Sequence, residues 1–140
     1  MKTRLLCLLL AAVPLSAWAA NFSGQWALQV PRPGRADQME TLYLNLNHAG
    51  NTVSGHLRSA VPPYSGSPLN TEIWDGRVEG DTISFYVWAG QDRPAKVQYK
   101  GVLSGEEIQF TITGGAPSFN IRGELNPPPA PRKGVARRVP

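Results

Sequence analysis

The chain contains one phrase twice: GRVEGDTISFYVW at residues 76–88 returns as GVLSGEEIQFTI at residues 101–112. In each copy a two-residue turn, Gly80-Asp81 or Gly105-Glu106, separates runs in which apolar and polar residues alternate, which is typical of a β-hairpin. Directly opposed residues share one sheet face, so each copy should have an apolar face on which a phenylalanine covers a glycine. The expected pairs are Val78 with Ile83, Gly76 with Phe85, Trp74 with Val87, Leu103 with Ile108, Gly101 with Phe110 and Tyr99 with Ile112.

A third hairpin fits the stretch LYLNLNHAGNTVSGHL, with its turn at Gly50-Asn51 and Leu44 facing Leu57. Its other face is polar, so the sheet should have one buried and one wet side. The full set of expected strands is 22–30, 40–48, 52–60, 70–79, 82–90, 95–104, 107–113 and 118–125. Such a meander can close on itself and remove both sheet edges. We therefore expect an all-β fold, an eight-stranded antiparallel up-and-down (meander) β-barrel; a two-sheet β-sandwich is the alternative.

Residues 1–19 have the pattern of a secretory signal peptide: a basic start, an apolar run and the small-x-small cleavage signal Ala17-Trp18-Ala19. The apolar run is shorter than the roughly 20 residues of a membrane span and is broken by Pro14; a retained membrane anchor is the alternative. Cleavage would give a periplasmic or secreted chain without a transmembrane segment. It would also remove Cys7, so no disulfide is expected.

The last residues, 127–140, are rich in proline and arginine and poor in large apolar side chains. We expect them to form a disordered basic tail, which either has no role or is loosely attracted to anionic surfaces. Between this tail and the signal peptide lies one domain at 20–126. This domain has 8 basic and 10 acidic residues although the whole chain carries +4, so the charge distribution argues against nucleic-acid binding.

In a meander, alternate connections lie at the same end of the barrel. The three tight turns should share one end, and the longer connections PRPGRADQM, VPPYSGSPLN, GQDRP and GGAPS should share the other. Ligands usually bind where such loops gather, and charged and aromatic side chains there could hold an anionic or sugar-like ligand. The expected ligand-binding residues are Arg32, Arg35, Tyr64, Trp74, Trp88, Asp92 and Arg93.

Alternation along the strands places the two tryptophans of this set on opposite faces of the sheet. We expect Trp74 just inside the rim, where it either meets a ligand or plugs the core. We expect Trp88 on the outer face, beside Ile73 and Tyr86. Exposed aromatic residues on one hairpin can mark a contact surface; cover by the proline-rich loop 61–70 is the alternative.

The stretch NFSGQWALQV resembles the opening strand of the calycins, the group that includes lipocalins, fatty-acid-binding proteins and avidins. Their mark is a Gly-x-Trp near the mature N-terminus, here Gly24-Gln25-Trp26. The resemblance implies a lipocalin-like barrel in which this Trp seals the end with the tight turns and a small ligand lies in the mouth. Lipocalins also place a basic residue of the last strand across the Trp. Arg122 is the candidate on the strand expected at 118–125, but alternation points it to the opposite face.

We expect no enzymatic activity, catalytic residue, metal or cofactor. The two histidines, His48 and His56, should lie roughly 10 Å apart on opposite faces, and no third metal ligand is evident. No nucleophile and base group together in the pattern. The sequence therefore favours an exported barrel that binds a small apolar or amphipathic ligand. The alternative is a cell-envelope interaction module that binds protein or polysaccharide through the outer aromatic residues and the basic tail.

Overall fold

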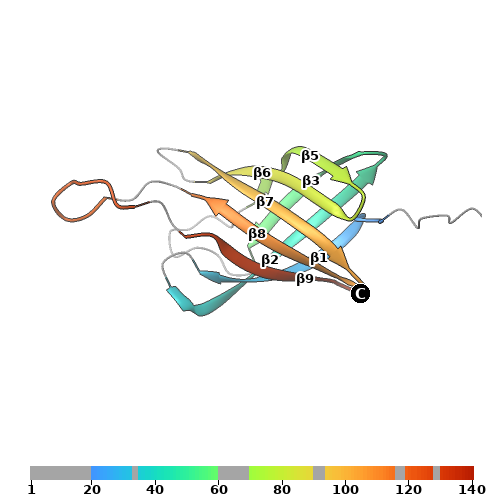
Figure 1. Ribbon diagram of the computed structural model, residues 1–140, viewed down its shortest axis with the longest axis horizontal. Coiled ribbons are helices and arrows are strands. Elements are labelled where there is room, and N and C mark those ends of the chain that lie inside the picture. Colours follow the sequence, from blue (N-terminus) through green and yellow to red (C-terminus); the bar gives the residue numbers. More distant parts are fainter. Residues whose placement is uncertain (1–19, 33–34, 60–69, 90–93, 116–118, 128–129) are drawn as a thin grey trace, which may run out of the picture.

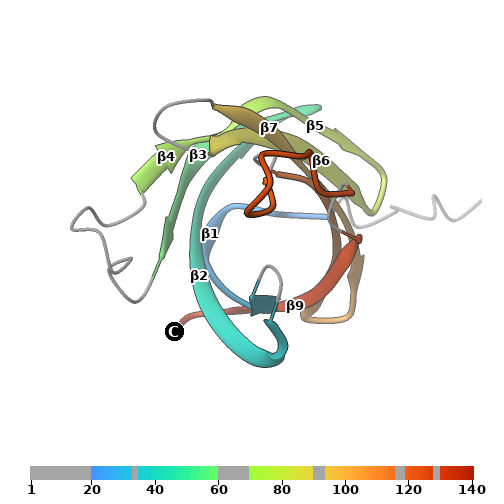
Figure 2. The ribbon, with the colours of Figure 1, turned by 90° about the vertical axis from the view of Figure 1, so that its left-hand side faces the viewer.

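The structure is a computed structural model that describes residues 20–32, 35–59, 70–89, 94–115, 119–127 and 130–140, without the side chains of residues 35 and 36. Within these residues the regular elements are all β-strands. They are β1 (Gly24–Arg32), β2 (Arg35–Ala49), β3 (Thr52–Ser59), β4 (Asn70–Glu72), β5 (Trp74–Glu79), β6 (Thr82–Ala89), β7 (Ala95–Ser104), β8 (Glu107–Gly114) and β9 (Arg132–Arg138). Together they form a tube (Figure 1), which appears as a ring when seen end-on (Figure 2).

The tube is a closed antiparallel barrel. Neighbouring strands pair in the order β2-β1-β9-β8-β7-β6-β5-β3-β4, and a further pairing between β2 and β3 closes the ring. β4 and β5 both border β3 and share one position that is interrupted at Ile73, so the ring has eight strand positions. The predicted up-and-down barrel is confirmed, and the closed ring rules out the alternative two-sheet sandwich.

The second copy of the repeated phrase folds in the predicted register. All three expected pairs form, including Gly101 with Phe110, and Phe110 is also paired on its other side with Gly134 of β9. A Cβ atom on Gly101 would lie 2.8 Å from the Phe110 ring. The two glycines thus leave bare backbone beside the ring, which lets it pack into the interior where the sheet curves. The predicted pairing of Leu44 with Leu57 is confirmed as well.

The first copy keeps the predicted register next to its turn and departs from it farther along β5. Val78 pairs with Ile83 as predicted, but Trp74 pairs with Tyr86 rather than with Val87. Between the pair of Arg77 with Ser84 and that of Trp74 with Tyr86, two residues of β5 stand opposite one residue of β6, which is a β-bulge. The bulge also removes the predicted pair of Gly76 with Phe85.

The bulge reverses the faces of the residues that precede it. Asp75 adopts a positive φ of 48°, and a Cβ atom on Gly76 would lie 1.9 Å from the carbonyl oxygen of Val53, so this segment presses closely against β3. As a result Ile73 is buried and Trp74 is exposed. The sequence-based expectation, with Trp74 inside and Ile73 outside, is wrong because alternation fails across a bulge.

The strand predicted at 118–125 is not part of the barrel. In its place a small hairpin, held by an isolated bridge between Phe119 and Leu125, projects from one end of the tube (Figure 1). Its apolar side chains are exposed, and Ile121 is fully so. Alternating apolar residues in this segment therefore do not face the barrel core.

The eighth position of the ring is instead β9, which lies within the segment predicted to be a disordered tail. β9 pairs with both β8 and β1, so the predicted domain boundary at 126 is wrong. The inward residues of β9 include Gly134 and Ala136, and a Cβ atom on Gly134 would lie 2.7 Å from the carbonyl oxygen of Gln29. Side chains of β1 and β8 already fill this part of the interior, so β9 contributes small residues and lacks a hydrophobic strand pattern.

The barrel has two unlike ends. The tight turns between β2 and β3, β5 and β6, and β7 and β8 lie at one end, here called the turn end; β1, β3, β6 and β8 finish at the other, the loop end (Figure 1). The predicted long connection from β1 to β2 is wrong, because the two strands stay paired out to Arg32 and Arg35 with two residues between them. Main-chain pairing continues there although no alternating apolar pattern marks it.

Apolar side chains fill the interior between the two ends. The core cluster contains 20 buried residues. Phe85 stacks on Tyr99 with ring centroids 5.0 Å apart, and it meets Phe110 edge-on at 6.0 Å. The described polar side chains that could contact a ligand therefore lie at the loop end or on the outer wall.

Candidate functional site

Of the predicted ligand-binding residues, the structure describes the side chains of Arg32, Trp74 and Trp88. Tyr64, Asp92 and Arg93 lie outside the described residues, as does the side chain of Arg35 at the start of β2. Arg32 is half-buried at the end of β1. The exposed tryptophans Trp74 and Trp88 are both on the outer wall.

A different pair of charged residues points into the loop end. Arg132, the first residue of β9, is two positions from the inward-facing Gly134; Glu40 of β2 is two positions from the inward-facing Leu42. Alternation therefore turns both side chains inward. Arg132 Nη1 lies 3.6 Å from Glu40 Oε1 and donates a hydrogen bond of 3.0 Å to the carbonyl oxygen of Pro31. The two side chains are 17% and 29% exposed, so solvent still reaches the pair.

Tyr99 lies in the core beside this ion pair. It is 3% exposed, and burial raises the pKa of its phenol to about 12; Arg132 opposes this shift and Glu40 adds to it. Both charges thus act on the phenol, while its ring is stacked in the apolar core. At neutral pH the described part of the loop end therefore holds a neutral phenol beside the ion pair of Arg132 and Glu40.

The turn end is sealed by a second arginine of β9. The Arg138 guanidinium lies 4.3 Å from the centre of the Trp26 ring, and it donates hydrogen bonds to the carbonyl oxygens of Ser23, at 2.7 Å, and of Asn21. Trp26 Nε1 donates to the carbonyl oxygen of Phe22 at 2.9 Å. The Trp26 indole N–H and both terminal nitrogens of Arg138 thus have partners in the chain.

Arg138 is the basic residue that the calycin resemblance calls for. Arg122, the candidate on the strand expected at 118–125, instead lies in the exposed hairpin. The error has the same cause as the misplaced last strand. The useful signal was the stretch RKGVARR, where arginine, glycine, alanine and arginine occupy every second position; the same signal would have identified Arg132.

The outer wall carries an aromatic cluster, formed by Trp74, Tyr86 and Trp88, and Lys96 packs against it. Trp74 and Trp88 are 47% and 44% exposed. Tyr86 meets Trp88 edge-on at 5.7 Å, and Lys96 Nζ lies 4.0 Å from the centre of the Tyr86 ring. Trp74 takes the place predicted for Ile73, and the loop 61–70, which was considered as a cover, lies almost wholly outside the described residues.

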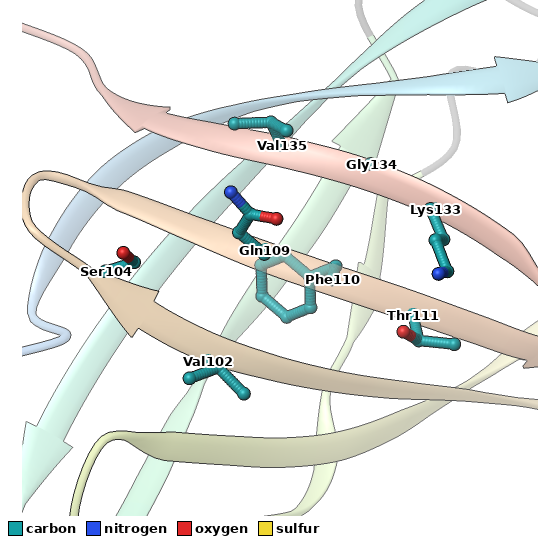
Figure 3. Close-up of a pocket in the computed structure, with 8 residues that line it drawn as sticks. All are labelled: Val102, Ser104, Gln109, Phe110, Thr111, Lys133, Gly134 and Val135. Atoms are coloured by element: carbon teal, nitrogen blue, oxygen red, sulfur yellow. The ribbon is translucent and has the colours of Figure 1, made fainter.

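A shallow groove of about 580 Å³ runs over the outer wall across β7, β8 and β9 (Figure 3). Neighbouring outward residues of β7, β8 and β9, namely Val102, Gln109 and Val135, form one row in it. Thr111 and Lys133 form the next row toward the loop end. The groove is open to solvent and faces away from the barrel interior.

The remaining candidates from the sequence have other surroundings. His48 accepts a hydrogen bond from the Phe22 amide at 3.3 Å, and its Nε2 donates to the Gly50 carbonyl oxygen at 2.7 Å. Among the described residues no group of His, Cys, Asp and Glu could hold a metal ion, and no helix could cross a membrane.

Neither a model of a known protein family nor a curated protein matches this chain.

Proposed function

We propose that this chain is an exported, non-enzymatic barrel of the calycin type that binds a small amphipathic ligand at its loop end. The calycin assignment is supported by the closed antiparallel barrel and by the Gly-x-Trp strand, whose Trp26 is covered by Arg138. The observation that carries the ligand proposal is the inward-facing ion pair of Arg132 and Glu40.

The position of this pair favours an anionic head group. A partly exposed ion pair contributes little net stability, yet this one stands at the mouth of an apolar interior. A carboxylate could displace Glu40 from the guanidinium and accept charge-assisted hydrogen bonds from it. The direct strand neighbours of the pair are Ile112, which faces Arg132, and Val30, which faces Glu40; both are apolar and buried in the core.

The test compares two arginines of the same strand. Arg132→Gln removes the inward cation, and Arg137→Gln removes an outward one that pairs with Glu107 at 2.9 Å. We expect the wild-type protein to bind the amphipathic anion anilinonaphthalene sulfonate and to release it when decanoate is added. Arg132→Gln should bind the dye about tenfold more weakly, the typical worth of a hydrogen bond to a charged group. Arg137→Gln should bind it unchanged.

Circular dichroism on all three proteins separates lost binding from lost folding. Native mass spectrometry of wild-type protein from its own host should also show added mass that Arg132→Gln lacks. Equal dye affinities for the two folded variants, or no dye binding by the wild type, would show that the proposed site is wrong.

A further inference from the structure

The outer wall of β6 to β9 has more cations than carboxylates, and the cations lie on β7 and β9. Its outward-facing residues include four cations and a single carboxylate, Glu107, which is already paired with Arg137. The other three cations are Lys96, Lys100 and Lys133. In the part of the chain that the structure describes, none of these three forms an ion pair, so each ammonium can meet an external anion.

The strand register arranges these cations among hydroxyl groups. Ser84 of β6, Lys100 of β7, Thr111 of β8 and Lys133 of β9 are paired in sequence and form one row across the wall. Neighbouring strands lie about 4.8 Å apart, so the row extends over roughly 14 Å. It ends at the groove in Figure 3, where Thr111 and Lys133 are side by side.

The aromatic cluster lies beside the Ser84 end of the row, because Tyr86 is two residues from Ser84 on β6. Trp74 stands across from Tyr86, and Trp88 follows Tyr86 by two residues on the same face. The two indoles are about half exposed, so ring faces are available for stacking. Lys96 lies against the Tyr86 ring and near the Trp88 ring, which adds a positive charge beside the indoles.

We propose that this wall binds an acidic polysaccharide, with sugar rings on Trp74 and Trp88 and carboxylate groups on Lys100 and Lys133. Flat aromatic faces suit the apolar face of a sugar ring, hydroxyl and amide side chains suit its hydroxyl groups, and the free ammonium groups supply charge complementarity. A lipid surface would call for aliphatic side chains between the cations, where the row has Ser84 and Thr111. This inference does not depend on the ligand proposed for the loop end.

The opposite wall supplies a matched control. There Arg58 lies over the ring of Tyr43 at 5.5 Å, so it also combines a cation with an aromatic ring. Its neighbours across β1 to β3 are mainly amides and hydroxyls, without further lysines. A binding effect of aromatic and cationic side chains in general would appear on both walls.

The experiment titrates the full-length exported protein with oligogalacturonate and with an alginate oligomer by calorimetry. We expect Trp74→Ala/Trp88→Ala to weaken binding about tenfold. Lys100→Gln/Lys133→Gln should weaken it several-fold and flatten its dependence on salt. Tyr43→Ala/Arg58→Gln should leave the affinity unchanged.

Three results would overturn the proposal: no binding of either oligomer by the wild type, equal loss of affinity in the opposite-wall variant, or equal affinity for neutral maltohexaose. Binding of anionic phosphatidylglycerol vesicles or duplex DNA in place of the oligomers would assign the wall to another class of partner. Thermal unfolding of each variant shows whether it is folded, and any unfolded double variant is replaced by its two single variants.

Discussion

The two ends of the barrel each hold an inward-facing arginine from the same strand, β9, and these arginines have different surroundings. Arg138 at the turn end covers an aromatic ring and donates to main-chain carbonyl groups of the chain that precedes β1. Arg132 at the loop end faces a carboxylate and stays partly open to solvent. Both guanidinium groups donate to a main-chain carbonyl group, but only Arg132 also faces a carboxylate, and a movable side chain is a partner that a ligand can replace.

This contrast explains why the last strand matters to both ends. β9 has few apolar side chains and fits the interior because Gly134 and Ala136 are small. Its value to the barrel lies in main-chain pairing with β1 and β8 and in the two arginines at its ends. Changes to β9 should therefore have effects that depend on which of these contributions they remove.

The largest effect is expected from a chain that ends at Asn126. It lacks β9, so the ring cannot close and the edges of β1 and β8 remain unpaired. The loss should exceed the about 5–15 kcal/mol that stabilises a typical domain, and circular dichroism should show no cooperative thermal transition. Deleting 119–125 is the control, because that hairpin is exposed. It should change the melting temperature by no more than about 2 °C. A truncated chain that melts like the wild type would show that β9 is dispensable.

The next effect compares the two arginines directly. Arg138→Ala removes a cation–π contact and hydrogen bonds from a charged donor, and should lower the free energy of unfolding by about 3 kcal/mol. Arg132→Gln removes a partly exposed ion pair and one hydrogen bond to the Pro31 carbonyl oxygen, and should lower it by about 1 kcal/mol. Urea unfolding of both variants measures the difference, with Arg137→Ala on the outer wall as the reference. Equal losses for Arg138→Ala and Arg132→Gln would contradict the distinction between the two ends.

The barrel itself was predictable because its signals are local. A glycine-led turn fixes a hairpin register, and alternation then assigns each side chain to a face, as it does for Leu103 and Ile108. The bulge at Asp75 makes alternation fail, because one additional residue reverses the face of every residue on the far side of the bulge from the turn. β9 was missed because its inward residues are small or charged, so no apolar period marks it.

The candidate site was harder to predict than the fold. Arg132 and Glu40 come from strands far apart in the sequence, and they meet only because closure brings β9 next to β1 and β2 beyond it. Assigning 127–140 to a tail removed Arg132 from consideration. The predicted loop residues Tyr64, Asp92 and Arg93 lie outside the described residues, and their part in ligand binding stays a prediction.

The last prediction uses pH to examine the loop end alone. Tyr99 has a folded-state pKa of about 12, above the value of about 10 for an exposed tyrosine. The folded chain therefore keeps this proton at pH values where the unfolded chain has lost it. The stability that comes from the neutral buried phenol is fully present below about pH 10 and is lost as the pH rises toward 12. The loss should be on the order of 2 kcal/mol.

Other tyrosines and the lysines also titrate in this range, so the measured quantity is a difference. Urea unfolding of the wild type and of Tyr99→Phe at several pH values between about 9 and 12 gives two curves, and their separation isolates the phenol of Tyr99. We expect Tyr99→Phe to gain stability relative to the wild type across this range, because its ring packs in the same place and has no proton to lose. Arg138→Ala should show the same pH dependence as the wild type, since its contacts lie at the other end of the barrel. Parallel curves for the wild type and Tyr99→Phe would mean that the phenol reaches solvent at the loop end, and the apolar layer beneath Arg132 and Glu40 would then be open rather than sealed.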